Sequence, residues 1–196
     1  GQSTCATCDP DEDDVLHALR ATGLAGVRDG DDGVARRDEC ALVRVAPTTL
    51  EGALDAVGVV GAALGAERAA AELVAVLRAR LRAARAAALA ALGGERRPLR
   101  VLSLEGLTPP CVGGHWLPDL KAAAGATDAL GDAGGARARR LSWDEIAAAD
   151  PDALVLCPCS SDCTRTLSEL HHVTDAPEFW GLRAVRDARV WIVDHE

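Results

Sequence analysis

The second half of the chain alternates between short apolar runs and amphipathic stretches. The apolar runs at 99–106 and 152–157 predict buried strands, and a shorter run at 138–142 predicts a third. Helical spacing separates these runs, and Ser142 and Glu145 have the spacing of a capping box where one of the helices begins. Strands and helices that alternate in this way are typical of an α/β fold with a parallel sheet.

Helical patterns dominate the first half of the chain. A short strand at 41–45 precedes a helix that opens with PTTLEGALDAV, in which Thr48 and Glu51 are spaced as a capping box. The longest pattern covers 66–92, with apolar residues on one side and arginines on the other. At a rise of about 1.5 Å per residue this helix would span roughly 40 Å. It is therefore long enough to be shared between two lobes.

Composition and charge argue against some classes of function. The net charge is −9, whereas binding to nucleic acid needs clustered cations. The arginine run from Arg78 to Arg85 is therefore interpreted as the solvated face of a helix. No uncharged apolar stretch of about eighteen residues is present, so the sequence predicts no membrane span. Methionine is absent, which indicates a processed chain or a fragment.

Cysteines are concentrated near the C-terminus. The segment LCPCSSDCTRTLSELHH (156–172) holds three of the seven cysteines and two of the five histidines. Its spacing is not that of a structural zinc site, in which cysteines form C-x2-C pairs. Cys157 ends a predicted strand and fits a small core residue, whereas Cys159 lies in the following loop and could face a ligand. Cys163 falls in the first turn of the next helix, and the two histidines lie at its far end.

Three segments carry a resemblance to a known family. They are RPLRVLSLEGLTPPCVGGHWLPDL (97–120), RRLSWDEIAAADPDALVLCPC (139–159) and FWGLRAVRDARVWIVD (179–194). Their order resembles that in the helical-backbone (class III) solute-binding proteins of ABC transporters. The branch that they most resemble is labelled cobalamin-binding, and Cys5-x-x-Cys8 is similar to the cysteine pair of that branch.

The resemblance implies an α/β fold of the periplasmic-binding-protein type, with two small parallel-sheet lobes joined by one long backbone helix. We expect a partial N-terminal lobe at 1–65, the connecting helix at 66–94 and a C-terminal α/β lobe at 95–196. Members of this family begin with a further strand and helix, and continue with a helix after the last strand. The N-terminal lobe is therefore expected to be incomplete, and the chain to be truncated at both ends.

Ligands meet parallel sheets at the carboxyl ends of the strands. The resemblance implies that a small molecule is clamped there, either cobalamin or another tetrapyrrole-like or metal complex, and is delivered to a transporter permease. The sequence contains no catalytic motif, so no enzymatic activity is predicted. The candidates for ligand binding come from a loop predicted at 107–116 and from the loop after the 152–157 strand: Cys111, Gly114, His115, Trp116, Pro158, Cys159 and Ser160.

His115 and Trp116 have two interpretations. The indole could stack on a flat macrocycle while the imidazole coordinates a metal or donates a hydrogen bond. Alternatively, Trp116 packs between the lobes and His115 caps the following helix. The remaining tryptophans are expected in the core: Trp143, Trp180 and Trp191.

Two other functions stay open. Cys5, Cys8 and Cys159, with His115 as a fourth ligand, could bind zinc or iron, and a C-x-x-C pair at a helix start also suits thiol redox chemistry. Otherwise the chain could be a truncated accessory or structural subunit of a larger assembly. The resemblance implies an extracytoplasmic location, but the sequence has no signal peptide, so an organelle or the cytoplasm also stays open.

Overall fold

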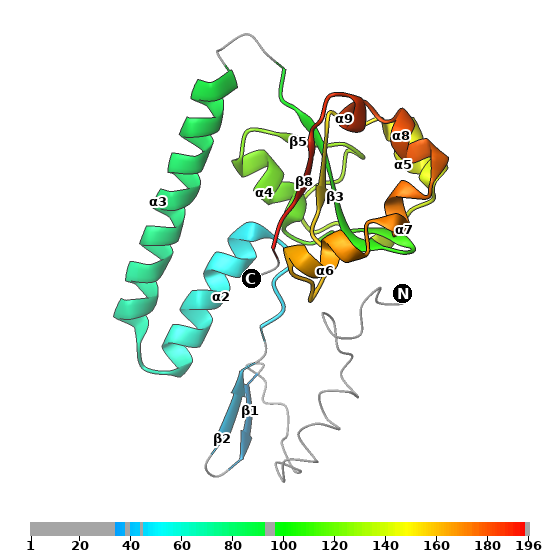
Figure 1. Ribbon diagram of the computed structural model, residues 1–196. Helices are drawn as coiled ribbons and strands as arrows, with labels where there is room; N and C mark the ends of the chain where they lie inside the picture. Colours follow the sequence, from blue (N-terminus) through cyan, green and yellow to red (C-terminus); the bar gives the residue numbers. More distant parts are fainter. Residues whose placement is uncertain (1–33, 38–39, 44, 93–96, 195–196) are drawn as a thin grey trace.

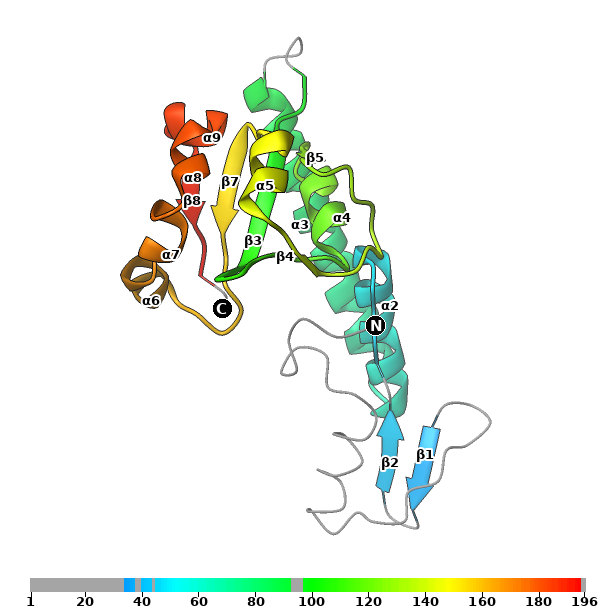
Figure 2. The same ribbon diagram turned by 90° about the vertical axis from the view of Figure 1, so that its right-hand side faces the viewer.

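The computed structural model describes residues 34–37, 40–43, 45–92 and 97–194. The larger part is a sheet with helices on both sides, and a pair of long helices runs beside it (Figure 1). Figure 2 shows the strands β3, β7 and β8 side by side, with α5 in front of them and α3 (Glu67–Leu92) behind.

The sheet is built on one long strand, β3 (Arg100–Leu107), whose leucines at 102, 104 and 107 are buried. The strand order is β6-β4-β3-β7-β8, and β5 also pairs with β3. β5, β7 and β8 belong to parallel pairings, whereas β4 and β6 form an antiparallel edge. The shorter strands are β4 (Pro110–Val112), β5 (Thr127–Asp128), β6 (Arg139–Arg140), β7 (Ala153–Leu156) and β8 (Val190–Ile192).

Short helices connect these strands and cover both faces of the sheet. α3 and α4 lie on one side, and α5, α7, α8 and α9 lie on the other (Figure 1). The core between the sheet and the second group contains Ile146, Val173, Phe179 and Leu182, all buried. The helices are α4 (Leu117–Ala123), α5 (Trp143–Ala149), α6 (Cys163–Ser168), α7 (His171–Thr174), α8 (Pro177–Gly181) and α9 (Arg183–Arg186).

The long helices α2 (Leu50–Ala63) and α3 (Glu67–Leu92) form a hairpin that closes tightly at its turn. A Cβ atom added to Gly61 would lie 2.3 Å from the Cβ of Ala70, so only glycine lets the helices approach this closely. α3 is continuous, which confirms the predicted long helix. Among the described helices, none combines the length and the apolar composition that crossing a membrane requires.

Before the hairpin, β1 (Val34–Arg37) pairs antiparallel with β2 (Cys40–Val43). The expected strand at 41–45 is therefore shifted by one or two residues. Its described partner runs antiparallel to it, rather than parallel as expected for this lobe. The domain boundaries proposed from the sequence stay predictions.

One of the two predicted capping boxes is present at the start of its helix, and the other is not. Ser142 and Glu145 form the expected capping box at the start of α5, with both reciprocal hydrogen bonds present. The capping box predicted for Thr48 and Glu51 is wrong. The N-cap of α2 is Thr49, and Glu51 instead forms an ion pair with Arg78 of α3.

Two connections also differ from the prediction. The segment 107–116 is not only a loop, because β4 turns back at Thr108 and Pro109 and pairs with β3. The helix that begins at Cys163 ends at Ser168, and a second one-turn helix begins at His171. His171 and His172 therefore start α7 and do not end the preceding helix.

Candidate functional site

The β3–β4 hairpin carries Cys111 to the carboxyl end of the central strand. Cys111 pairs with Gly106 across the ladder. A Cβ atom added to Gly106 would lie 3.0 Å from that of Cys111, so the cysteine side chain lies beside the position that glycine leaves empty. Cys111 is partly exposed there.

The loop after β7 is fixed to the same end of β3 by two backbone hydrogen bonds. The N–H of Cys157 donates to the carbonyl of Leu104 at 2.9 Å, and that of Cys159 donates to the carbonyl of Glu105 at 3.1 Å. Pro158 is buried, and Ser160 is exposed and has a φ of +57°, in the left-handed region. Cys111 and Cys159 thus lie on opposite sides of β3 at the same end of this strand.

Farther along this edge, residues 113–116 are held against the segment at 135–136. A Cβ atom on Gly114 would lie 2.1 Å from the carbonyl oxygen of Ala136, so glycine is required for this approach. His115 has a φ of +55°. Its N–H donates to the carbonyl of Ala136 at 2.6 Å, and its carbonyl accepts from the N–H of Gly135 at 2.9 Å. The backbone of His115 is therefore fixed on both sides.

Trp116 follows as the N-cap residue of α4, without a side-chain hydrogen bond to the helix. Its side chain is large and apolar, yet the residue is 39% exposed. The rings of His115 and Trp116 lie 5.9 Å apart, centroid to centroid, with their planes inclined by 38°. An indole and an imidazole thus stand together on a rigid loop, and the cap of α4 is not the histidine.

Glu105 is a residue at this edge that sequence reasoning missed. A Cβ atom on Gly113 would lie 2.3 Å from the Glu105 carboxyl carbon, so the carboxylate lies directly beneath the 113–116 loop. The signal was present in the sequence, since Glu105 is a carboxylate near the end of an otherwise largely apolar run.

Cys157 lies close to this carboxylate. Burial, together with the negative charge of Glu105, raises the pKa of the Cys157 thiol to about 11, although the charge of Lys121 opposes the rise. Lys121 is itself buried and forms an ion pair with Asp128 at 2.5 Å. The protonated thiol is therefore the favoured form of Cys157 at neutral pH. The residue is only partly buried, so its expected role as a small core residue stays a prediction.

The predicted zinc or iron site cannot be assembled from the described residues. Cys5 and Cys8 lie outside them, and the described part of the chain contains no group of three or more His, Cys, Asp or Glu side chains arranged for a metal ion. The site formed by Cys5, Cys8 and Cys159, with His115 as fourth ligand, stays a prediction.

The expectation that the remaining tryptophans are core residues is wrong for two of them. Trp143 packs against the core, edge to face with Phe179. Trp180 is 59% exposed, because it lies on the outer side of the short helix α8, where its Nε1–H donates to the carbonyl of Thr174. Trp191 is 49% exposed, because it lies on β8 at the end of the strand order.

The sequence itself defines the class of this protein. Residues 27–196 match the family model described as periplasmic binding protein. Because this match covers most of the chain, the chain belongs to the periplasmic binding protein family. No curated protein sequence matches it.

Solved structures with the same fold include proteins that bind metal-containing macrocycles. The periplasmic heme-binding protein RhuT from Roseiflexus sp. RS-1, in apo form, is 24% identical, with a TM-score of 0.64 over 95% of this chain and 64% of its own. A periplasmic heme-binding protein from Pseudomonas aeruginosa is 24% identical, with a TM-score of 0.61 over 92% of this chain and 59% of its own. The periplasmic vitamin B12 binding protein BtuF of Vibrio cholerae is 15% identical, with a TM-score of 0.55 over 76% of this chain and 54% of its own.

At these identities the likeness concerns the fold. It confirms the α/β architecture of the periplasmic-binding-protein type and the family that the motif order indicated. The chain spans between 54% and 64% of the length of these three proteins.

Proposed function

We propose that this chain receives a flat, metal-containing macrocycle of the heme or cobalamin class at the carboxyl edge of its sheet. It does so as a non-catalytic part of the solute-binding protein of an ABC transporter, which passes the ligand to a permease. An extracytoplasmic location belongs to the same proposal.

The observation that carries this proposal is the pair of rings on the 113–116 loop. Trp116 is exposed although its indole is apolar, and the backbone of His115 is held by hydrogen bonds on both sides. A ligand that covers the indole would remove this apolar surface from water, at about 25 cal/mol for each Å². The rigid loop means that little conformational entropy is lost when the ligand binds.

The side chains at this edge suit a macrocycle with a central metal. The face of an indole stacks on an extended aromatic ring system, and a neutral imidazole is a common axial ligand of iron and cobalt. Cys111 on β4 and Cys159 in the loop after β7 contribute a polarisable wall. Two of the similar structures are heme-binding proteins and the third is a vitamin B12 binding protein, which supports the same class of ligand.

A titration with hemin, followed by absorbance, tests the proposal. We expect stoichiometric binding with the spectrum of a histidine-ligated iron, and His115→Ala is expected to lose that spectrum and to weaken binding by about tenfold or more. His172→Ala is the matched control, because His172 lies on α7 and away from the strand ends. A parallel titration with aquacobalamin distinguishes between the two macrocycles.

The proposal fails if neither macrocycle binds to the wild-type protein. It also fails if His115→Ala and His172→Ala bind hemin with the same spectrum and affinity as the wild type. Far-ultraviolet circular dichroism of each variant excludes unfolding as the cause of a loss.

A further inference from the structure

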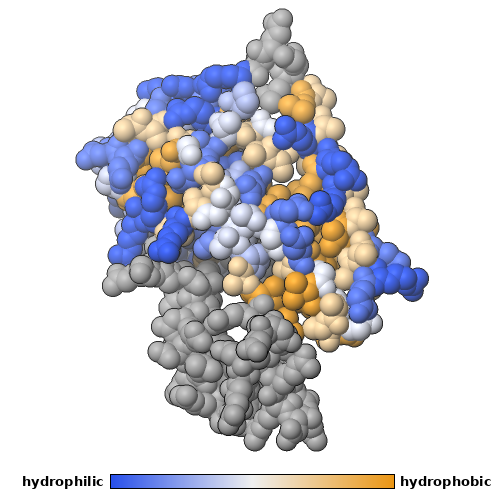
Figure 3. Space-filling view, turned by 180° about the vertical axis from the view of Figure 1, so that it is seen from behind, coloured by the Kyte–Doolittle hydropathy of each residue, from blue (hydrophilic) through white to orange (hydrophobic). Residues whose placement is uncertain are grey.

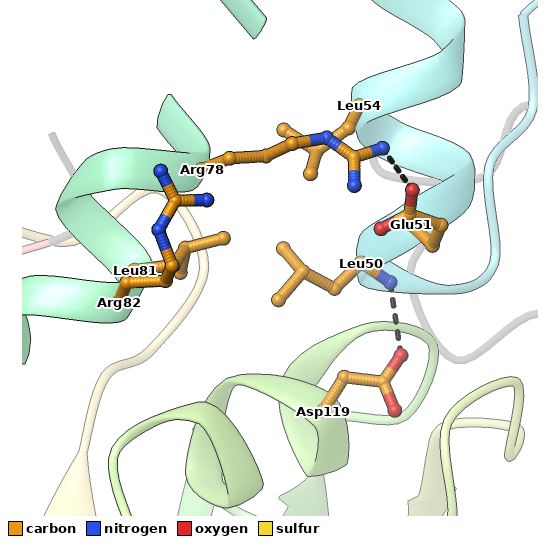
Figure 4. Close-up of a pocket in the computed structure, with 7 residues that line it drawn as sticks. All are labelled: Leu50, Glu51, Leu54, Arg78, Leu81, Arg82 and Asp119. Atoms are coloured by element: carbon orange, nitrogen blue, oxygen red, sulfur yellow. Dashed lines mark hydrogen bonds and ion pairs between the residues drawn. The ribbon is translucent and has the colours of Figure 1, made fainter. Parts of the chain in front are cut away.

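A pocket of about 430 Å³ lies between the helical hairpin and α4 (Figure 4). Its volume falls within the range of about 300–1,000 Å³ that is usual for small-molecule sites. The pocket is lined by Leu50, Glu51, Leu54, Arg78, Leu81, Arg82 and Asp119.

Three leucines supply the apolar part of this pocket. Leu50 and Leu54 project from α2, and Leu81 projects from α3, so the apolar walls face one another across the hollow (Figure 4). Leu54 is 6% exposed, which makes it a fixed wall rather than a mobile surface side chain. Seen from behind, the part of the surface that carries α2 and α3 mixes apolar and charged side chains (Figure 3).

Both carboxylates of the pocket are already engaged. Glu51 forms an ion pair with Arg78. Asp119 accepts a hydrogen bond from the N–H of Leu50 at 2.9 Å, at the beginning of α2, where the helix dipole is positive. The charge of Glu51 is therefore balanced by Arg78, whereas the charge of Asp119 is only partly offset by the N-terminus of α2.

The guanidinium of Arg82 is not engaged in this way. Among the described residues, none forms a hydrogen bond or ion pair with it, and it stands at the rim beside Arg78 (Figure 4). Arg85, one turn further along α3, donates instead to the carbonyl of Ala122 on α4. The arginine run is thus not simply a solvated face, because it turns Arg78, Arg82 and Arg85 toward the rest of the molecule.

We propose that this pocket binds a small amphipathic anion, namely a carboxylate on an aliphatic chain. The carboxylate accepts hydrogen bonds from the Arg82 guanidinium, and the chain lies against Leu50, Leu54 and Leu81. A charge-assisted contact supplies the direction of binding, and burial of the chain supplies affinity. The lining contains none of the residues proposed to bind the macrocycle, although Asp119 lies one turn after Trp116 on α4.

The test uses octanoate as the probe, titrated into the whole chain and followed by calorimetry. We expect saturable binding, and Arg82→Gln is expected to weaken it by about tenfold, the loss of one charge-assisted contact. Arg80→Gln is the matched control, because Arg80 is exposed on the same helix and does not line the pocket. Octylamine has a similar chain and the opposite charge. We expect it to bind at least tenfold more weakly than octanoate.

Three results would overturn the proposal: no octanoate binding to the wild type, equal effects of Arg82→Gln and Arg80→Gln, or octylamine binding as tightly as octanoate.

Leu81→Ala gives a second check, because it shortens one apolar wall and should weaken octanoate binding without removing the charge. His115→Ala should bind octanoate normally, so a failure of the macrocycle site would not be mistaken for a failure of this one.

Discussion

Cys157 and Cys159 are two residues apart but differ in their suitability as metal ligands or nucleophiles. The Cys157 thiol lies close to the carboxylate of Glu105. Burial and this negative charge raise the pKa of the thiol to about 11, which favours its protonated form at neutral pH. Because the thiolate is the metal ligand and the nucleophile, Cys157 is a poor candidate for either role. Cys159 lies in the loop beyond the strand, so the thiol-metal hypothesis depends on it.

If Cys5, Cys8 and Cys159 share a zinc or iron ion, replacing one ligand should release it. Purified wild-type protein is then expected to contain stoichiometric metal by elemental analysis, and Cys159→Ser to lose it. Cys157→Ser is the matched control and should retain the metal. A wild-type protein without metal, whose stability does not change with a chelator, would rule the site out.

Asp152 anchors the opposite end of the sheet. Its buried carboxylate accepts hydrogen bonds from Arg97 at 2.5 and 2.7 Å, from the N–H of Arg100 at 2.8 Å and from Arg183 at 2.8 Å. The hydrogen bond from Arg97 is the largest cause that holds the pKa of Asp152 well below its ordinary value. Since the folded state favours the charged form, this carboxylate stabilises the fold above a pH of about 4, and the contribution is lost as the pH falls further.

Asp152→Asn is therefore expected to lower the free energy of unfolding by about 2–3 kcal/mol at neutral pH. Denaturant unfolding at a series of pH values should show that this difference shrinks below a pH of about 4, because the Asp152 carboxylate of the unfolded wild-type chain then becomes protonated while that of the folded chain stays charged. Asp55→Asn, on the exposed side of α2, should change the free energy by no more than about 0.5 kcal/mol. A difference for Asp152→Asn that stays constant down to the lowest pH would contradict this account.

At the scale of elements, the predictions that held are those that depend on neighbouring residues alone. The capping box of Ser142 and Glu145 formed as expected because both partners lie within one turn. The box expected for Thr48 and Glu51 did not form, because the N-cap of α2 is Thr49, and the Glu51 carboxylate pairs with Arg78 on another helix. No local pattern contains that contact.

Two glycines of α2 test the packing of the hairpin, because replacing them with alanine should change the free energy of unfolding in opposite directions. Gly61→Ala should lower the free energy of unfolding by about 1–3 kcal/mol, because the new methyl group would overlap the Cβ of Ala70. Gly58→Ala meets nothing within 4 Å and should raise it by about 0.5–1 kcal/mol through helix propensity. Thermal or denaturant unfolding measures both, and equal effects of the two substitutions would show that the helices do not touch as described.

For the whole molecule, the order of strands and helices was enough to predict the α/β class and the long helix. The antiparallel strand β4 was not predicted, because Pro109 and Pro110 mark a turn and hide the short pairing of Cys111 with β3. The loop after β7 was located correctly, since the end of that strand follows from the pattern, whereas the loop predicted at 107–116 contains β4. The place of Glu105 beneath Gly113 was not predicted, because only the folded hairpin brings the two together.

The central claim is that the ligand lies on the indole at the carboxyl edge of the sheet. The most direct measurement compares hemin affinity between Trp116→Ala and Trp180→Ala by absorbance titration. Both tryptophans are exposed, at 39% and 59%, but Trp180 lies on α8, away from the strand-end loops. The account predicts that Trp116→Ala weakens hemin binding by about tenfold or more while Trp180→Ala leaves it unchanged. Equal affinities in the two variants, or a loss confined to Trp180→Ala, would contradict it.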